Sequence, residues 1–318
     1  MANELNFDQY PYLKRAREFS TRTLKNLSDS LGRESHHGVA TIYIAGSLGR
    51  LEASNVADVD CVVLSDGHHE QTVAQAFPDV HRALSETGLK LPKSDGIYAR
   101  VGAPATVWSR RWRGDLNEPK ATFGKRLQCL LDGRAIYRPS AFADLQQRTL
   151  CWYEVGNDPQ NLVDEVKRYL YTYRVWQRFS KVNSESDSWA LRQIKLRGPR
   201  LITFAGLLML LSDFDLCHQA KFVKRLSLSP LERIAAVGEQ HQLAVSPIVA
   251  LYDQYLSVLN DPGIRAAMIA SVASSNQELT NEPWARESNI LELAQELENC
   301  LNLLFVALRP SAKSWSVF

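Results

Sequence analysis

The sequence has few of the features that mark secreted or membrane proteins. Its 318 residues include five cysteines, an odd number with no Cys-x-x-Cys pair. This usage is typical of thiols kept reduced and packed as small apolar side chains. The N-terminal residues lack the apolar core of a signal peptide, and the longest apolar run, at 201–211, is too short to span a bilayer. We therefore expect a soluble cytoplasmic protein with no membrane partner.

The net charge and the motifs that are missing argue against several further classes of protein function. The net charge is only +2, so no global attraction to nucleic acid or anionic lipid is implied. No Cys/His set has zinc spacing, and neither a P-loop nor a Ser-His-Asp arrangement is present. The function has to be sought in a less common motif.

The distribution of apolar residues predicts an α+β fold. A helix is expected over about 8–31, strands over 39–46 and 58–67, a helix over 69–88, and one or two strands within 97–108. From about 120 onward the apolar residues have helical spacing, in the segments 122–137, 161–181, 188–212, 229–240 and 288–308. We expect a head of mixed sheet and flanking helices at 1–145, followed by an α-helical substrate- or partner-binding domain at 146–318.

Two acids at alternate positions open the second predicted strand. Side chains alternate across a strand, so Asp58 and Asp60 should point to one face and Val59 to the other. Two ionised carboxylates this close repel each other, and a divalent cation between them removes the conflict. Mg²⁺ takes carboxylate oxygens together with phosphate oxygens, so the pair predicts a Mg²⁺ or Mn²⁺ site for a nucleoside triphosphate.

A glycine turn stands at the end of the preceding strand. Gly46 would let a phosphate approach the backbone, and Ser47 opens a segment expected to begin a helix, whose N–H groups favour anions. Arg50 could add a forked donor to phosphate or, if buried, pair with Glu52. Each signal alone is weak, since most Asp-x-Asp pairs are solvated turn acids. Their joint order favours the functional interpretation.

These residues carry a resemblance to a known family. The segment GSLGRLEASNVADVD resembles the nucleotidyltransferase signature of the DNA polymerase β superfamily, in particular the branch that includes the bacterial nitrogen-regulator protein uridylyltransferase. The matching positions are Gly46, Ser47, Gly49, Arg50, Glu52, Asp58 and Asp60. The segment 122–137 is similar to a helix of the same branch, whose end is matched by Leu131, Asp132 and Arg134. Ala57 and Leu51 depart from the pattern, standing where Ser or Thr and Gly are frequent.

The resemblance implies transfer of a nucleoside monophosphate from an NTP to an acceptor, with release of pyrophosphate. The superfamily also carries a third carboxylate on a later strand. Asp95 is our choice for this third metal ligand and general base, although it fits a turn acid equally well, and Asp115 and Glu118 are rivals. The acceptor, a protein hydroxyl or a small molecule, cannot be read from the residues.

A basic run follows in the helical region. Between Lys167 and Arg200 there are nine basic residues against two acidic ones. Arg192 and Lys195 share a helical face and are predicted to contact the triphosphate or the acceptor across a cleft. A solvated helix face explains the same run equally well.

Two rival functions stay open. One is a catalytically weak regulatory module that binds a nucleotide and a partner protein. The other is a nucleotidyltransferase acting on RNA ends, which would need a continuous basic groove. Binding of nucleic acid is therefore possible but not favoured.

Overall fold

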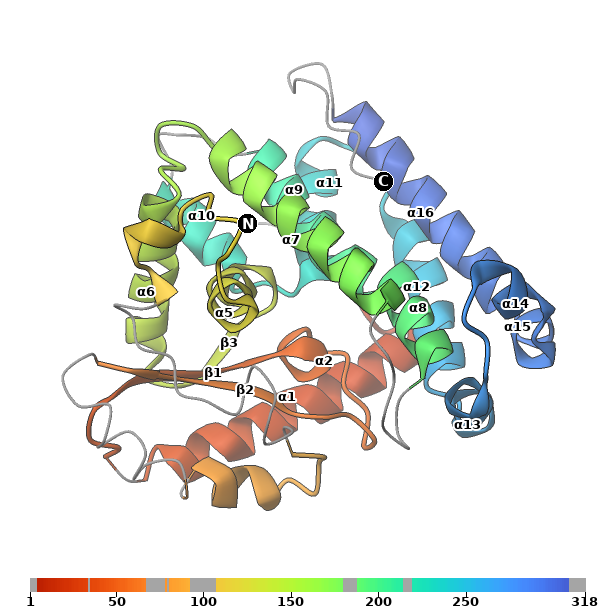
Figure 1. The fold of residues 1–318 in the computed structure, drawn as a ribbon, viewed down its shortest axis with the longest axis horizontal. Helices are drawn as coiled ribbons and strands as arrows, with labels where there is room; N and C mark the ends of the chain where they lie inside the picture. The colour runs from red at the N-terminus through yellow and green to blue at the C-terminus, as the bar shows by residue number, and fades with distance from the viewer. Residues whose placement is uncertain are drawn as a thin grey trace. The chain divides into compact units, whose positions relative to one another are not determined.

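A computed structural model of the protein describes residues 5–33, 35–66, 78, 80–91, 107–179, 188–213 and 219–308. Within them the fold is α+β, mostly helical, with a three-stranded antiparallel sheet (Figure 1). The chain divides into two compact units. The sheet unit contains residues 15–165 and 214–229, and the helical unit contains 1–14, 166–213 and 230–318. Helices α1 and α7 contribute residues to both units.

Each helix and strand has most or all of its residues in one of the two compact units. Those of the sheet unit are α1 (Pro11–Leu31), β1 (Val39–Ala45), α2 (Gly46–Gly49), β2 (Asp60–Ser65), the 3₁₀ helix η1 (Arg110–Trp112), α5 (Lys120–Leu131), β3 (Arg134–Tyr137), α6 (Pro139–Trp152) and α10 (Gln219–Leu226). Those of the helical unit are α7 (Gln160–Phe179), α8 (Trp189–Arg197), α9 (Pro199–Ser212), α11 (Pro230–Gln240), α12 (Ser246–Leu259), α13 (Pro262–Ala270), α14 (Asn276–Asn281), α15 (Pro283–Glu287) and α16 (Ile290–Ala307).

The sheet has the order β2-β1-β3, and both strand pairs are antiparallel. On one face, Ile44 and Val63 belong to an apolar cluster with Leu24 and Leu27 of α1. On the other face, the Tyr43 ring lies 5.0 Å from that of Phe142 in α6, between ring centroids. Helices therefore cover both faces of the sheet within this unit (Figure 1). Strand β1 is central because its β-branched residues can be buried on both sides.

Strand β3 corrects the prediction of continuous helical structure over 122–137. Helix α5 ends at Leu131, and Arg134–Tyr137 pairs with β1 instead. The break lies at Gly133, whose N–H donates to Gln128 O at 2.8 Å. A Cβ there would lie 2.9 Å from the Cα of Cys129, so only glycine fits this close return of the chain. Apolar spacing alone did not reveal the change from helix to strand.

The predicted helical segment 188–212 is two helices joined at Gly198. A Cβ on Gly198 would come within 2.1 Å of the Tyr255 ring of α12. Pro199 then begins α9, which is buried on nearly all sides. Gly206 of α9 lies against Pro230 of α11, because a Cβ on this glycine would lie 2.5 Å from the Pro230 carbonyl oxygen. Close packing thus fixes both glycines in the core of the helical unit.

Several sequence predictions can be compared with the observed elements. The helix near the N-terminus and the first two strands are confirmed as α1, β1 and β2, and 229–240 and 288–308 as α11 and α16. Helices α6, α10 and α12 to α15 were not predicted. Residues 69–77 and 97–106 lie outside the described part of the chain. The domain boundary at 145/146 stays a prediction, and the compact units are discontinuous in sequence.

Candidate functional site

The glycine turn lies directly against one of the predicted metal ligands. Ala45, the last residue of β1, is paired with Asp60, the first residue of β2. Gly46 follows with φ of +70°, and a Cβ on it would lie 2.2 Å from Asp60 Oδ2. Only a residue without a side chain leaves this carboxylate where it is. The turn and the acid, 14 positions apart in the sequence, form one local structure.

The two acids alternate around a buried residue. Val59 is fully buried, whereas Asp58 is exposed and Asp60 is half-buried. The backbone around them is held from outside the sheet, because the Val59 N–H donates to Lys90 O at 2.9 Å. Asp58 and Lys90 form a parallel bridge, the one parallel pairing among the described residues. The alternation puts both carboxylates on the side of the chain that Val59 does not face.

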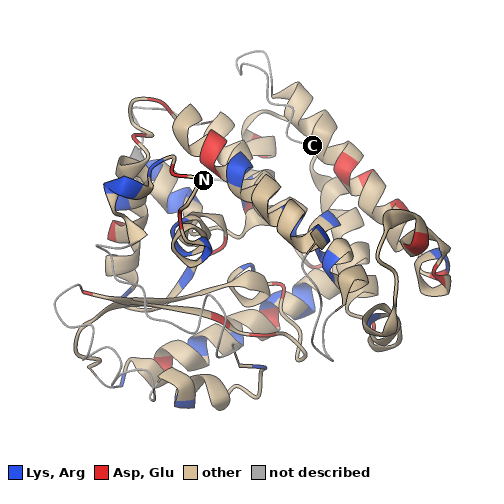
Figure 2. Ribbon diagram, in the orientation of Figure 1, with Lys and Arg blue, Asp and Glu red and all other residues tan. Residues whose placement is uncertain are grey.

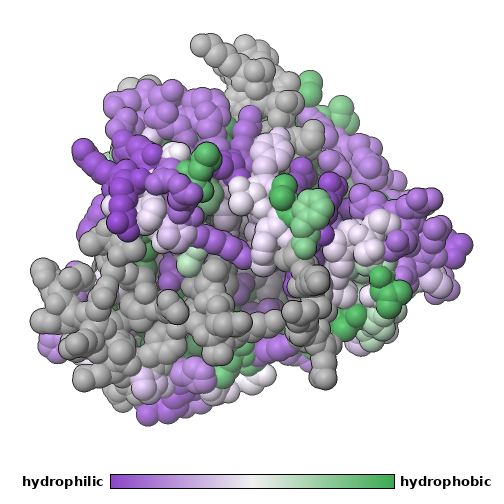
Figure 3. All heavy atoms as spheres, in the orientation of Figure 1, coloured by the Kyte–Doolittle hydropathy of each residue, from purple (hydrophilic) through white to green (hydrophobic). Residues whose placement is uncertain are grey.

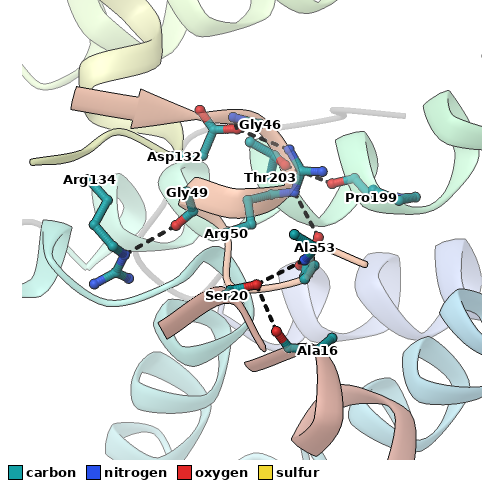
Figure 4. Close-up of polar contacts among 11 residues, drawn as sticks. Ala16, Ser20, Gly46, Gly49, Arg50, Ala53, Asp132, Arg134, Pro199 and Thr203 are labelled. Carbon is teal, nitrogen blue, oxygen red and sulfur yellow. Dashed lines mark hydrogen bonds and ion pairs between the residues drawn. The ribbon is translucent and has the colours of Figure 1, made fainter. Parts of the chain in front are cut away.

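A buried ion-pair group lies behind the turn (Figure 4). Arg50 donates from Nε to Glu52 at 2.8 Å and from Nη1 to Asp132 at 3.0 Å. Only 10% of the Arg50 side chain is exposed, with 4% for Glu52 and 7% for Asp132. The Asp132 carboxylate also accepts the N–H of Gly46, at 3.1 Å. One carboxylate from the end of α5 therefore fixes both the start of the turn and its arginine.

Further contacts hold the rest of the motif. Arg134 Nε donates to the carbonyl oxygen of Gly49 at 3.2 Å, and a Cβ on Gly49 would lie 2.3 Å from the Asp132 carbonyl oxygen. The N–H of Ala53 donates to the buried Ser20 hydroxyl of α1 at 3.0 Å. The segment 46–53 is thus fixed by contacts from β3, α5 and α1 (Figure 4).

Leu51 explains one departure from the family pattern. Its φ is +64°, in the left-handed region that glycine adopts without strain. Leu51 is buried, with 7% of its surface exposed. The apolar contact of its side chain offsets part of the backbone strain that a glycine would avoid.

The rivals for the third carboxylate have other partners. Both carboxylate oxygens of Glu118 contact the buried guanidinium of Arg126, at 2.6 Å and 2.8 Å. Asp115 accepts the N–H of Asn117 in an exposed turn. Asp95 lies outside the described residues. Within the described part of the chain, no group of three or more His, Cys, Asp or Glu residues is arranged to hold a metal ion.

The donor set that is described suits a hard cation shared with a substrate. Asp58 and Asp60 supply carboxylate oxygens, which Mg²⁺ and Mn²⁺ prefer, and Mg²⁺ often takes only one or two carboxylates together with phosphate oxygens. Next to them, burial raises the pKa of the Cys61 thiol to about 12, and the negative charge of Asp60 contributes to the same rise. Cys61 therefore stays a neutral, apolar residue beneath the acids.

The predicted basic residues belong to the helical unit. Arg192 and Lys195 lie on α8 and are half-buried, and the Arg192 guanidinium lies 5.8 Å from the centroid of the Trp176 ring. Ser47, the other predicted contact for nucleotide, is in α2 of the sheet unit and is half-buried. The assignment of all three to nucleotide binding stays a prediction.

The sequence pattern did not predict Asp132 as a residue of the site. It lies 86 positions from Gly46, and only its place in the motif Leu-Leu-Asp-Gly-Arg marked it. Comparisons of the chain with families of proteins, with curated proteins and with solved structures found no match. In the described residues, none of the helices combines the length and apolar character needed to cross a membrane.

Proposed function

We propose that the sheet unit is a nucleotidyltransferase head and that the chain transfers a nucleoside monophosphate from NTP·Mg²⁺ to an acceptor. The observation that carries the proposal is the contact between Gly46 and Asp60. It puts a glycine turn, whose backbone carries no side chain, against a carboxylate whose neighbour Asp58 faces the same side.

The reaction is a displacement at the α-phosphorus. The acceptor oxygen bonds to this phosphorus, the bond to the β-phosphate oxygen breaks, and pyrophosphate leaves. A metal ion held by Asp58 and Asp60 would neutralise the charge that develops on the phosphate oxygens. The turn at Gly46 and Ser47 would hold the outer phosphates, and Asp95 would take the proton of the acceptor hydroxyl.

Arg50 supports the proposal through its position behind the turn. Its guanidinium pairs with Glu52 and Asp132, which fixes the backbone from Gly46 to Glu52. A rigid support lowers the reorganisation needed when the phosphates bind. Of the two roles considered for Arg50, the pairing with Glu52 is the one that the contacts favour.

The proposal can be tested by labelling. The purified protein is incubated with a cell lysate, Mg²⁺ or Mn²⁺, and each α-³²P-labelled NTP in turn. We expect label in a protein or small-molecule fraction with the wild type and with Asp144→Asn, an exposed acid of α6 that serves as the control. Asp60→Asn should give none.

The labelling experiment, together with a titration of the protein with NTP, separates the rival functions. Label confined to RNA ends would replace the proposal by an RNA-end transferase. Saturable binding of NTP with no label in any fraction would replace it by a regulatory module. The absence of both binding and label would contradict the nucleotidyltransferase assignment altogether.

A further inference from the structure

A basic pocket of about 400 Å³ lies within the helical unit. Its walls come from α7, α8, α9, α14 and α16. Three arginines line it, Arg174, Arg178 and Arg197, against one acid, Glu298. Figure 2 shows basic residues along α7 and α8, and Figure 3 shows apolar side chains at the surface over α7. The excess of guanidinium groups gives this pocket a positive potential.

One of the arginines is oriented by a neutral partner. Arg197 Nη2 donates to the Asn276 side-chain oxygen at 2.9 Å, which fixes the guanidinium without neutralising it. Among the described residues, Arg178 and Arg197 form no ion pair. An oriented guanidinium presents its remaining N–H groups as a fork that matches phosphate or carboxylate oxygens.

The side-chain amide of Gln193, in the wall of the pocket, is a second feature that points to a ligand. Gln193 lines the pocket with only 7% of its surface exposed, and its Nε2 group has no hydrogen-bond partner among the residues described. A buried donor without a partner destabilises the fold, and most such groups in folded proteins have a hydrogen-bond partner. An acceptor oxygen of a bound ligand would satisfy this group.

The lining also has an apolar part. Leu196, Leu201 and Leu291 contribute to the walls beside the charged groups. Small-molecule sites commonly combine an apolar lining of this kind with a few convergent polar groups, in clefts of about 300–1,000 Å³. The pocket therefore suits a ligand with one anionic group and an organic body.

We propose that this pocket binds a small organic phosphate. The phosphate contacts the guanidinium of Arg197 and the amide of Gln193, and the organic part packs on the leucines. The charge of three arginines favours phosphate, with up to two negative charges, over a single carboxylate. This site lies in the helical unit and does not depend on transfer by the sheet unit.

Calorimetric titration tests the proposal with three probes: phenyl phosphate, inorganic phosphate and benzoate. Phenyl phosphate should bind in a saturable manner and more tightly than the other two. Arg197→Met should weaken binding about tenfold or more, the loss of one charged hydrogen bond. Arg197→Lys, which keeps the charge but not the fork, should lie between Arg197→Met and the wild type. Gln193→Met should weaken binding by a smaller factor, about fivefold.

The control is Arg286→Met, an exposed arginine of α15 outside the pocket. It should bind phenyl phosphate as the wild type does, and Asp60→Asn should also leave binding unchanged. Circular dichroism checks that each variant is folded. The proposal is overturned if phenyl phosphate does not saturate, if it binds no better than inorganic phosphate, or if Arg197→Lys and Arg286→Met have equal affinities.

Discussion

Gly46 and Gly88 have nearly equal φ angles, so replacing each by alanine distinguishes the effect of backbone strain from the effect of the contact with Asp60. Gly46 has φ of +70° and Gly88 has φ of +69°. Alanine at Gly46 would place its Cβ 2.2 Å from Asp60 Oδ2, whereas at Gly88 nothing lies within 4 Å. Gly46→Ala and Gly88→Ala therefore share the backbone strain and differ in the contact with Asp60.

The expected magnitudes follow from these two terms. The left-handed backbone angle should lower the free energy of unfolding by about 1–2 kcal/mol in both variants. At Gly46 the Asp60 carboxylate must also leave its rotamer, which adds about 0.5–1.5 kcal/mol. The total for Gly46→Ala is then roughly 1.5–3.5 kcal/mol. The effect on function should be larger, because the displaced group is the proposed metal ligand.

Urea denaturation followed by circular dichroism measures the first effect, and the labelling assay measures the second. Gly46→Ala should reduce transfer about a hundredfold, as a displacement of about 1 Å does at other active sites. Gly88→Ala should transfer label at the wild-type rate. Equal stabilities together with equal transfer rates would refute the reasoning, since Gly46 would then have no special relation to Asp60.

Three further predictions concern the surroundings of the site. Asp132→Ala should lower the free energy of unfolding by about 3 kcal/mol, because a buried guanidinium loses one carboxylate, and a change below about 1 kcal/mol in urea denaturation would contradict this. Lys195→Ala should weaken the binding of NTP·Mg²⁺ by roughly 1.5–3 kcal/mol in calorimetry. The control is Lys221→Ala, which changes an exposed lysine and should not alter the affinity. Equal affinities of the two variants would mean that the basic run at 167–200 is a solvated surface and not a nucleotide site. At pH 8 a maleimide should label the exposed Cys151 but not Cys61, whose pKa burial raises from 9.0 to about 12. Labelling of Cys61 in the folded protein at pH 8 would refute its burial. The contribution of the protonated Cys61 thiol to the free energy of unfolding is fully present below pH 9.0 and is lost as the pH rises toward about 12.

The sequence predicts the parts of the fold that depend on local pattern. The β-branched residues of 39–45 and 60–65 indicate strands, and amphipathic spacing indicates α1. Strand β3 was not predicted, because the segment LLDGRAIY continues the apolar spacing of a helix and only Gly133 interrupts it. Its partner in the sheet, β1, lies about 90 residues earlier, so the pairing has no local signal.

The candidate site also has one part that the local sequence pattern predicts and one part that it does not. The alternation of Asp58 and Asp60 could be read directly from their spacing. The contacts of Asp132 with Gly46 and Arg50 could not, because they join segments 86 and 82 positions apart. Nothing in the spacing indicated that a carboxylate from the end of a helix would fix the turn.

The central claim is that Asp58 and Asp60 hold the metal for transfer of a nucleoside monophosphate. The most direct measurement supplies the accepting fraction with NTP labelled on either the α- or the γ-phosphate, in the presence of Mg²⁺ or Mn²⁺. We expect the α label in the acceptor and the γ label in pyrophosphate, with no transfer by folded Asp58→Asn/Asp60→Asn protein. Transfer by the purified double variant, or γ label in the acceptor, would contradict the account.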